Sequence, residues 1–206
     1  MEKIKVLIVD DHAILRMGLS SLLGTRKDIA VVGDAGSGDL ALRKYPKLKP
    51  DVVIMDLVMP GKNGIFTTQE LRAAHPEARV LILTTFGTSD SIAMALKAGA
   101  TGAIMKSAAF PDLVEAIKAT AAGKTCIAPE IARILADDPP VKELSPRQRQ
   151  ILESMVRGLT NVDIARQLGI SLDMVKEHGI ALFAKIGAAN RTEAVAIALR
   201  KQLVKI

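Results

Sequence analysis

Cysteine and aromatic residues are scarce in this chain of 206 residues, and tryptophan is absent. The one cysteine, Cys126, cannot form a disulfide within the chain or build a zinc site that needs several cysteines. This usage is typical of a cytoplasmic protein. Aromatic residues make up only 2% of the chain, which disfavours binding of single-stranded nucleic acid by stacking of bases on aromatic rings.

Long uncharged segments are missing as well. The longest stretch without Asp, Glu, Lys or Arg is 80–89, ten residues, whereas a membrane-spanning helix needs roughly 20 mostly apolar residues. The chain begins Met-Glu-Lys immediately before an apolar run, so we expect neither a signal peptide nor a membrane as a partner. With 49% hydrophobic and 24% charged residues, the composition is that of a globular protein and not of a disordered one.

Positive charge is concentrated near the C-terminus. The chain carries a formal net charge of +6, and residues 141–206 supply +5 of it, with 11 Lys and Arg against 6 Asp and Glu. A basic segment of this kind is either a solvated surface or a contact for the phosphates of a nucleic acid. Charge alone favours neither interpretation.

The first 124 residues alternate between short apolar runs and amphipathic stretches with apolar residues at helical spacing. Strands that are almost wholly apolar are buried on both faces of a parallel sheet. The pattern therefore predicts an α/β domain over residues 1–124, with a five-stranded, doubly wound parallel sheet of the flavodoxin-like kind. The expected strands are 4–9, 29–32, 52–55, 80–83 and 103–105.

Residues 125–143 contain Pro129, Pro139 and Pro140, and they predict a linker with one or two helical turns near Ile131. Residues 144–206 predict an all-α domain of four helices. The second and third of these are separated by a short turn, which is the arrangement of a helix-turn-helix. The expected N-caps are Ser145, Asn161, Ser171 and Thr192.

Polar residues follow the predicted strands: Asp10 and Asp11 the first, Asp56 the third, Thr84 the fourth and Lys106 the fifth. Ligands bind at the carboxyl ends of parallel strands, so we expect these side chains to share one pocket. A single acid at a strand end is usually a helix cap or a loop charge. Three carboxylates together repel one another unless a cation lies among them, and oxygen ligands suit Mg²⁺. A lysine and a hydroxyl beside them suit a phosphoryl group, which a carboxylate can accept.

Both halves of the chain resemble known families. Residues 1 to about 124 are similar to the receiver domain of two-component response regulators, and residues 144–206 to the LuxR-type helix-turn-helix of the NarL/FixJ class. The receiver motifs are VLIVDDH at 6–12, DVVIMDLVMPGKNG at 51–64, RVLILTT at 79–85 and GATGAIMK at 99–106. The helix-turn-helix motifs are LSPRQRQIL at 144–152, GLTNVDIARQLGIS at 158–171, VKEH at 175–178 and NRTEAV at 190–195.

The resemblance implies a phosphoacceptor, Asp56, which takes a phosphoryl group from a sensor histidine kinase. Thr84 and Lys106 would lie beside that group. The implied ligands of Mg²⁺ are Asp10 (mostly through water), Asp11, Asp56 and the backbone carbonyl of Val58.

One position departs from the receiver pattern, and two others bear on access of water to the phosphoryl group. The position three before the lysine is usually Tyr or Phe but is Ala103 here, so we expect a weakened or altered switch, although the transfer chemistry does not need that ring. Val58 and Phe86 are both apolar and can shield an acyl phosphate from water. They predict slow self-dephosphorylation.

In the resembled family, the helix capped by Ser171 lies in the major groove of double-stranded DNA. Lys176 can reach a phosphate or guanine, Glu177 the N4 amine of cytosine, and Ile180 a thymine methyl. Residues 172–186 carry no net charge, so we expect DNA affinity either to be modest or to depend on a homodimer in the active state. Alternatively, the residues on this face of the helix form only a solvated surface. Further candidates for contact with the DNA backbone include Lys185 and Arg191.

Three functions fit these residues. The first is a transcriptional regulator, not an enzyme, whose DNA binding is controlled by phosphorylation of Asp56. The second is a degenerate regulator that acts through protein contacts or binds DNA whatever its phosphorylation, as Ala103 and the neutral helix suggest. The third is a Mg²⁺-dependent phosphatase with Asp56 as its nucleophile, and the basic helical domain argues against it.

Overall fold

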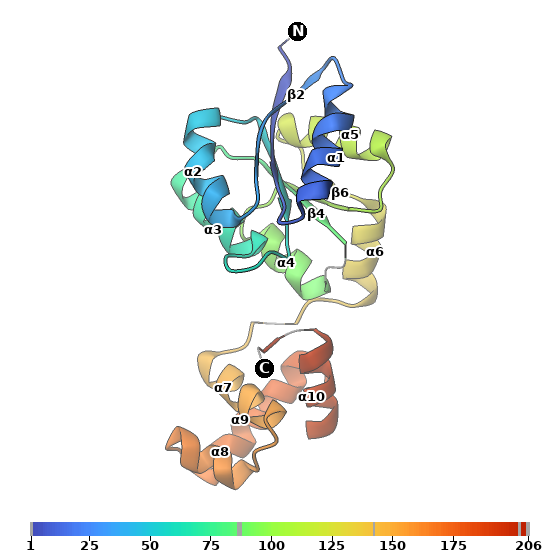
Figure 1. Cartoon of the computed structure of the whole chain (residues 1–206). Coiled ribbons are helices and arrows are strands. Elements are labelled where there is room, and N and C mark those ends of the chain that lie inside the picture. The colour runs from blue at the N-terminus through green and yellow to red at the C-terminus, as the bar shows by residue number, and fades with distance from the viewer. Residues whose placement is uncertain (1, 86–87, 142, 202, 205–206) are drawn as a thin grey trace. The chain divides into compact units, whose positions relative to one another are not determined.

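The computed structural model divides the chain into two units, Met1–Pro139 and Pro140–Ile206 (Figure 1). No helix within the described residues is long and apolar enough to cross a membrane. The described residues are 2–85, 88–141, 143–201 and 203–204.

One parallel sheet forms the centre of the first unit, with strand order β2-β1-β3-β4-β5-β6. The chain goes from β1 to one neighbour, β2, and then to the other, β3, so the direction of winding reverses between β1 and β3. The predicted doubly wound parallel sheet is therefore confirmed. The strands are β1 (Ile4–Val9), β2 (Ile29–Ala35), β3 (Val52–Asp56), β4 (Val80–Thr84), β5 (Gly102–Met105) and β6 (Cys126–Ile127).

Helices cover both faces of this sheet (Figure 1). Successive side chains of a strand point to opposite faces, so Val6 and Ile8 pack with α1 and α5, whereas Leu7 and Val9 pack with the other helices. The strands are apolar at nearly every residue because neither face meets water. The helices are α1 (Ala13–Gly24), α2 (Gly38–Leu48), α3 (Gly64–Ala74), α4 (Ser89–Lys97), α5 (Phe110–Ala121) and α6 (Pro129–Asp137).

Within the described residues, the sheet has six strands where the sequence predicted five. The one or two helical turns predicted near Ile131 are found as the helix α6, which is longer and packs on the sheet. β6 pairs with β5 and places Ile127 opposite Ala103. A Cβ at Gly102 would lie 2.3 Å from the Cys126 carbonyl oxygen, so this close pairing requires glycine. The α6 helix then buries Ile131 completely in the core that also contains Ala103. The extra strand forms because β5 would otherwise be an unpaired edge of the sheet, and two residues are enough to pair with it.

The described residues of the second unit form four helices, as predicted. Their shared core includes Ile151, Leu152, Ile164, Val175 and Leu182, all fully buried. The α8 and α9 helices are joined by the short turn at residues 169–171, which confirms the helix-turn-helix. The helices are α7 (Pro146–Val156), α8 (Asn161–Leu168), α9 (Leu172–Ile186) and α10 (Arg191–Arg200).

The N-caps of these helices differ partly from prediction. Ser145 and Ser171 cap α7 and α9 as expected. Thr160 caps α8, one residue before the predicted Asn161, and Asn190 caps α10, two residues before the predicted Thr192. At the start of α8 and of α10, two residues suited to capping lie close together in the sequence. The residue that caps the helix accepts a hydrogen bond from the backbone amide three residues later.

Candidate phosphoacceptor pocket and DNA-binding surface

Three side chains meet in a buried pocket at the carboxyl ends of the strands. The ammonium of Lys106 lies 2.6 Å from Asp10 Oδ2 and 2.9 Å from Asp56 Oδ2. Asp10, Asp56 and Lys106 are 2%, 3% and 9% exposed at their side chains. Their strands are not adjacent in sequence, so the topology of the sheet brings together the groups that the sequence predicted would meet.

Local backbone geometry aims the two carboxylates. Asp10 Oδ1 accepts a hydrogen bond from the His12 amide at 2.8 Å, and Asp56 Oδ1 accepts a long one from the Val58 amide at 3.4 Å. The start of α3 passes close behind Asp56, because a Cβ at Gly64 would lie 2.0 Å from the Asp56 carbonyl oxygen. Glycine is therefore required at Gly64 for this helix to approach the pocket.

Burial and charge act in opposite directions on the ionisable groups. Burial raises the pKa of Asp56 above its ordinary value, and Asp10 adds to this, while the bond and charge of Lys106 only partly offset it. Burial by itself lowers the pKa of Lys106, but hydrogen bonds to Asp10 and Asp56 outweigh it and leave that pKa raised. Lys106 is therefore protonated at neutral pH.

Two further residues complete a group that could hold a metal ion. Asp10, Asp11, His12 and Asp56 each offer one ligand atom, and these atoms lie within 4.8 Å of one another. Three of the four donors are carboxylates, which fits a hard divalent cation. His12 is 69% exposed, and its Nδ1 lies 3.0 Å from Asp11 Oδ1. Sequence reasoning gave His12 no role, although it directly follows the two aspartates in the motif at 6–12.

Thr84 contributes a buried hydroxyl at the end of β4. Its side chain is fully buried, and its Oγ1 has no hydrogen-bond partner among the described residues. Its carbonyl accepts a hydrogen bond from the Lys106 amide at 2.7 Å, which joins the ends of β4 and β5. A buried hydroxyl without a partner costs about 1–3 kcal/mol, so this one is suited to donate a hydrogen bond to a bound ligand. Phe86 lies outside the described residues.

The loop after Asp56 presents Val58 to solvent, where it is 68% exposed. The ammonium of Lys62 anchors the same loop, because it lies 3.0 Å from Asp39 Oδ1 and 2.6 Å from Glu70 Oε2. Ala103 is fully buried between Ile82 of β4 and Ile127 of β6. It has no side-chain torsion that could transmit a change in the pocket.

On the second unit, the exposed face of α9 carries Lys176, Glu177 and Ile180. Ile180 is 70% exposed, and the Lys176 ammonium lies 3.1 Å from Asp173 Oδ1. The three residues thus share a surface and are available to a partner. Ile180 is therefore not part of the core of this unit.

Lys185 and Arg191 are engaged inside their own unit. The Lys185 ammonium donates to the Glu143 carbonyl and to Gln148 Oε1, both at 2.9 Å. Arg191 donates to Asn161 Oδ1 at 3.3 Å, and its guanidinium also donates to carbonyls near the end of α7, those of Met155 and Leu159. Most of these acceptors are backbone oxygens, which every residue has, so these hydrogen bonds could not be predicted from the sequence.

Comparisons with known proteins match both units. Residues 6–118 match the family described as "Response regulator receiver domain", and residues 142–198 match "Bacterial regulatory proteins, luxR family". The chain is similar to "Response regulator protein VraR" of Staphylococcus aureus, with 34% identity over 98% of this chain and 99% of that protein.

Two solved structures are similar over nearly the whole chain. The response regulator ChrA of a heme-sensing two-component system is 37% identical, with a TM-score of 0.60 over 99% of this chain and 100% of that one. RcsB from Salmonella enterica serovar Typhimurium, bound to promoter P1flhDC with the phosphomimetic BeF3-, is 26% identical, with a TM-score of 0.72 over 95% and 98%. The chain therefore belongs to the response regulators that combine a receiver domain with a LuxR-type helix-turn-helix domain.

Proposed function

We propose that this chain is a transcriptional regulator whose DNA binding is controlled by transfer of a phosphoryl group from a histidine kinase to Asp56. The unit Met1–Pro139 would carry out the phosphoryl chemistry, and the unit Pro140–Ile206 would bind double-stranded DNA. The observation that carries this proposal is the buried Lys106 ammonium between Asp10 and Asp56. The buried Thr84 hydroxyl at the end of β4, which has no hydrogen-bond partner among the described residues, adds support.

In this proposal, Asp56 Oδ2 attacks phosphorus, the bond from phosphorus to the kinase histidine breaks, and an acyl phosphate forms. The Lys106 cation neutralises oxygens of the transferred group, and the Thr84 hydroxyl donates to one of them. Mg²⁺, when bound, would supply further positive charge to those oxygens. The ligands we propose for it are Asp10, Asp11, Asp56 and the backbone carbonyl of Val58.

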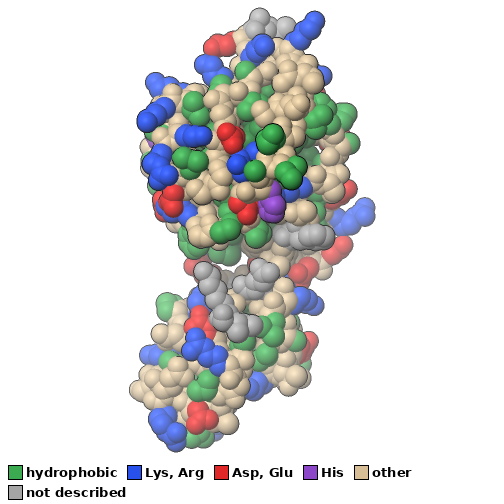
Figure 2. All heavy atoms as spheres, in the orientation of Figure 1, with side chains coloured by type: hydrophobic (Ala, Val, Ile, Leu, Met, Phe, Trp, Pro, Cys, Tyr) green, Lys and Arg blue, Asp and Glu red, His purple; other side chains and the backbone are tan. Residues whose placement is uncertain are grey.

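The kinase needs a docking surface near this pocket. Ile14 and Met17, on the first turns of α1, are 87% and 72% exposed directly after the acidic turn. Figure 2 shows hydrophobic side chains gathered on the face of the first unit that carries α1. Exposed apolar side chains that cluster beside a reactive site favour a protein partner there.

We propose that α9 enters the major groove of DNA, with Lys176, Glu177 and Ile180 toward the bases or phosphates. The likeness to RcsB, which was solved with promoter DNA, supports this half of the proposal. Lys185 and Arg191 would have a smaller part than the sequence suggested, because their bonds inside the unit leave fewer free donors. A homodimer would double the contacts that one nearly neutral helix can make.

The cytoplasm, where bacterial DNA lies, is the location that follows from these partners.

The phosphatase alternative is not retained, because the chain belongs to a family that generally acts as transcription factors. The degenerate regulator remains a second candidate on one observation. Ala103 is fully buried beside β6, in the core that contains Ile131 of α6, so the usual aromatic side chain is not there to move.

Selection of genomic DNA fragments by the purified chain, with and without acetyl phosphate and Mg²⁺, tests the two candidates. The first candidate predicts that the phosphoryl donor increases the recovery of a defined set of fragments, and that Asp56→Asn abolishes the increase. Equal recovery with and without the donor would instead favour the degenerate regulator.

A further inference from the structure

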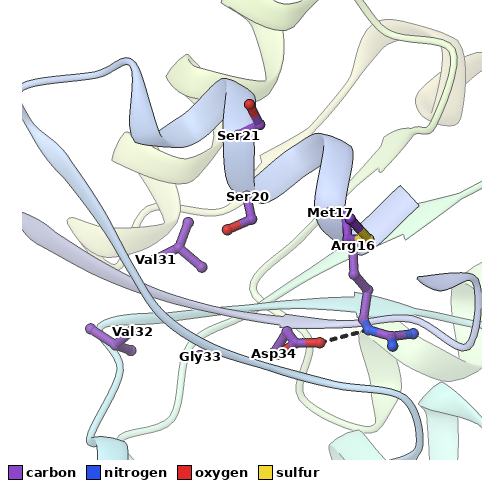
Figure 3. A pocket seen from close by; sticks show the side chains of 8 residues that line it. All are labelled: Arg16, Met17, Ser20, Ser21, Val31, Val32, Gly33 and Asp34. Atoms are coloured by element: carbon purple, nitrogen blue, oxygen red, sulfur yellow. Dashed lines mark hydrogen bonds and ion pairs between the residues drawn. The ribbon is translucent and has the colours of Figure 1, made fainter. Parts of the chain in front are cut away.

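Arg16 on α1 joins the ends of two strands beside the pocket. Its Nε lies 2.7 Å from Asp34 Oδ2 at the end of β2, and its Nη1 donates to the Asp10 backbone carbonyl at 2.7 Å. The side chain is 17% exposed. Figure 3 shows the guanidinium extended from α1 to Asp34, at one side of a shallow hollow between α1 and β2.

The two neighbouring aspartates differ in what holds them. The carboxylate of Asp10 has its own fixed partners, the His12 amide at 2.8 Å and the Lys106 ammonium at 2.6 Å. Asp11, within the described part of the chain, has only the ring of the exposed His12 beside its carboxylate. The direction of the Asp11 side chain therefore depends on the peptide that joins it to Asp10.

The Arg16 guanidinium binds the oxygen of that same peptide. We infer that Arg16 is a positioning residue, which fixes the Asp10–Asp11 peptide and so aims the Asp11 carboxylate at the site of the divalent cation. This inference rests on the proposed phosphoacceptor function. It assigns Arg16 a role in cation affinity and not in phosphoryl transfer itself.

The geometry favours arginine over lysine at this position. A planar guanidinium can hold Asp34 and the Asp10 carbonyl at once, whereas one ammonium offers no such fixed fork. Lys44 donates to the Asp34 carbonyl, which fixes the residue that orients Arg16. Because Asp34 already balances the charge of Arg16, the effect on the pocket is positional more than electrostatic.

The test compares Arg16→Ala and Arg16→Lys with a matched control, Arg26→Ala. Arg26 follows the other end of α1 and forms a similar ion pair with Asp28 at 3.0 Å, far along the helix from the acidic turn. Two quantities are measured for each variant: the rise in Tm that Mg²⁺ causes, and the Mg²⁺ concentration for half-maximal phosphorylation by acetyl phosphate.

We expect Arg16→Ala to require about tenfold more Mg²⁺ in both measurements, as is typical when a group that orients a metal ligand is removed. The rate at saturating Mg²⁺ should change much less. Arg16→Lys should recover part of the loss, and Arg26→Ala should match the unaltered chain. If Arg16→Ala does not fold, Arg16→Lys and Asp34→Asn carry the test, each with a smaller shift in the same direction.

An unchanged Mg²⁺ dependence in these variants would overturn the inference, whatever their Tm without metal. A fall in Tm with normal Mg²⁺ dependence would likewise show that Arg16 only supports the fold. If the unaltered chain is not phosphorylated at all, the proposed function fails, and the effect of Mg²⁺ on Tm still decides the role of Arg16.

Discussion

At the scale of single residues, the buried carboxylate of Asp56 opposes folding at neutral pH. Because the pKa of Asp56 is raised in the folded state, its carboxyl group stabilises the fold most at pH values below the ordinary pKa of 3.8. This stabilisation is lost as the pH rises through the pKa of the folded state. We therefore predict that Asp56→Asn raises Tm at pH 7 in EDTA, and that the difference shrinks toward pH 4. Thermal unfolding of both chains across this range measures it. A variant less stable than the parent at pH 7 would contradict the argument.

Lys106 has the opposite effect. Its raised pKa means that its stabilising contribution is present at neutral pH and is lost only in strongly alkaline solution. Replacement by methionine leaves the buried Asp10 and Asp56 carboxylates without their cation. We predict that Lys106→Met destabilises the first unit by about 3 kcal/mol at pH 7. Urea unfolding measures the change, with Lys3→Met at the exposed N-terminal end as the control.

Residues at strand ends were predictable because strand periodicity locates them and parallel topology brings them together. Asp10, Asp56 and Lys106 lie as the sequence suggested. The roles of Lys185 and Arg191 inside the helical unit were not predictable, since their acceptors are mainly carbonyl oxygens that any residue supplies. The same holds for Arg16, which binds the carbonyl of Asp10.

At the scale of elements, β6 depends on close approach to β5. We predict that Gly102→Ala displaces β6, because the added Cβ would meet the Cys126 carbonyl oxygen at 2.3 Å. The amide of Ala128, which donates to the Ala103 carbonyl at 3.0 Å, should then exchange hydrogen faster. Gly24→Ala is the control, since a Cβ there meets nothing within 4 Å. Unchanged exchange at Ala128 would show that the pairing tolerates a side chain.

This element was missed from the sequence for a physical reason. A strand of two residues shows no periodicity. The helix that follows was predicted only as one or two turns, because the prolines around it predict a linker. The longer strands β1, β3 and β4 and the helix-turn-helix were predictable, because burial on both faces and capping residues leave clear patterns.

The helix α9, which we propose contacts DNA, allows a prediction with two opposed variants. Lys176→Ala should weaken DNA binding and reduce the slope of log affinity against log salt by about 1, as loss of one phosphate contact does. Asp173→Asn should strengthen binding, because it frees the Lys176 ammonium that now lies 3.1 Å from Asp173. Fluorescence anisotropy over a salt series measures both. Equal slopes for the parent and Lys176→Ala would place this lysine away from the phosphates.

At the scale of the whole molecule, charge and chemistry are divided between the two units. Residues 141–206 carry a net charge of +5 out of the total of +6, and the acidic pocket belongs to the other unit. This division is expected of a protein that receives a signal at one unit and binds a polyanion with the other. The role of Asp56 as the acceptor of that signal is the claim on which the proposed regulation depends.

The intact mass of the chain after incubation with acetyl phosphate and Mg²⁺ tests this claim. We predict a single added phosphoryl group, which disappears in Asp56→Asn and is greatly reduced in Lys106→Met. An unchanged mass, or a phosphoryl group that persists in Asp56→Asn, would contradict the assignment of Asp56 as the phosphoacceptor.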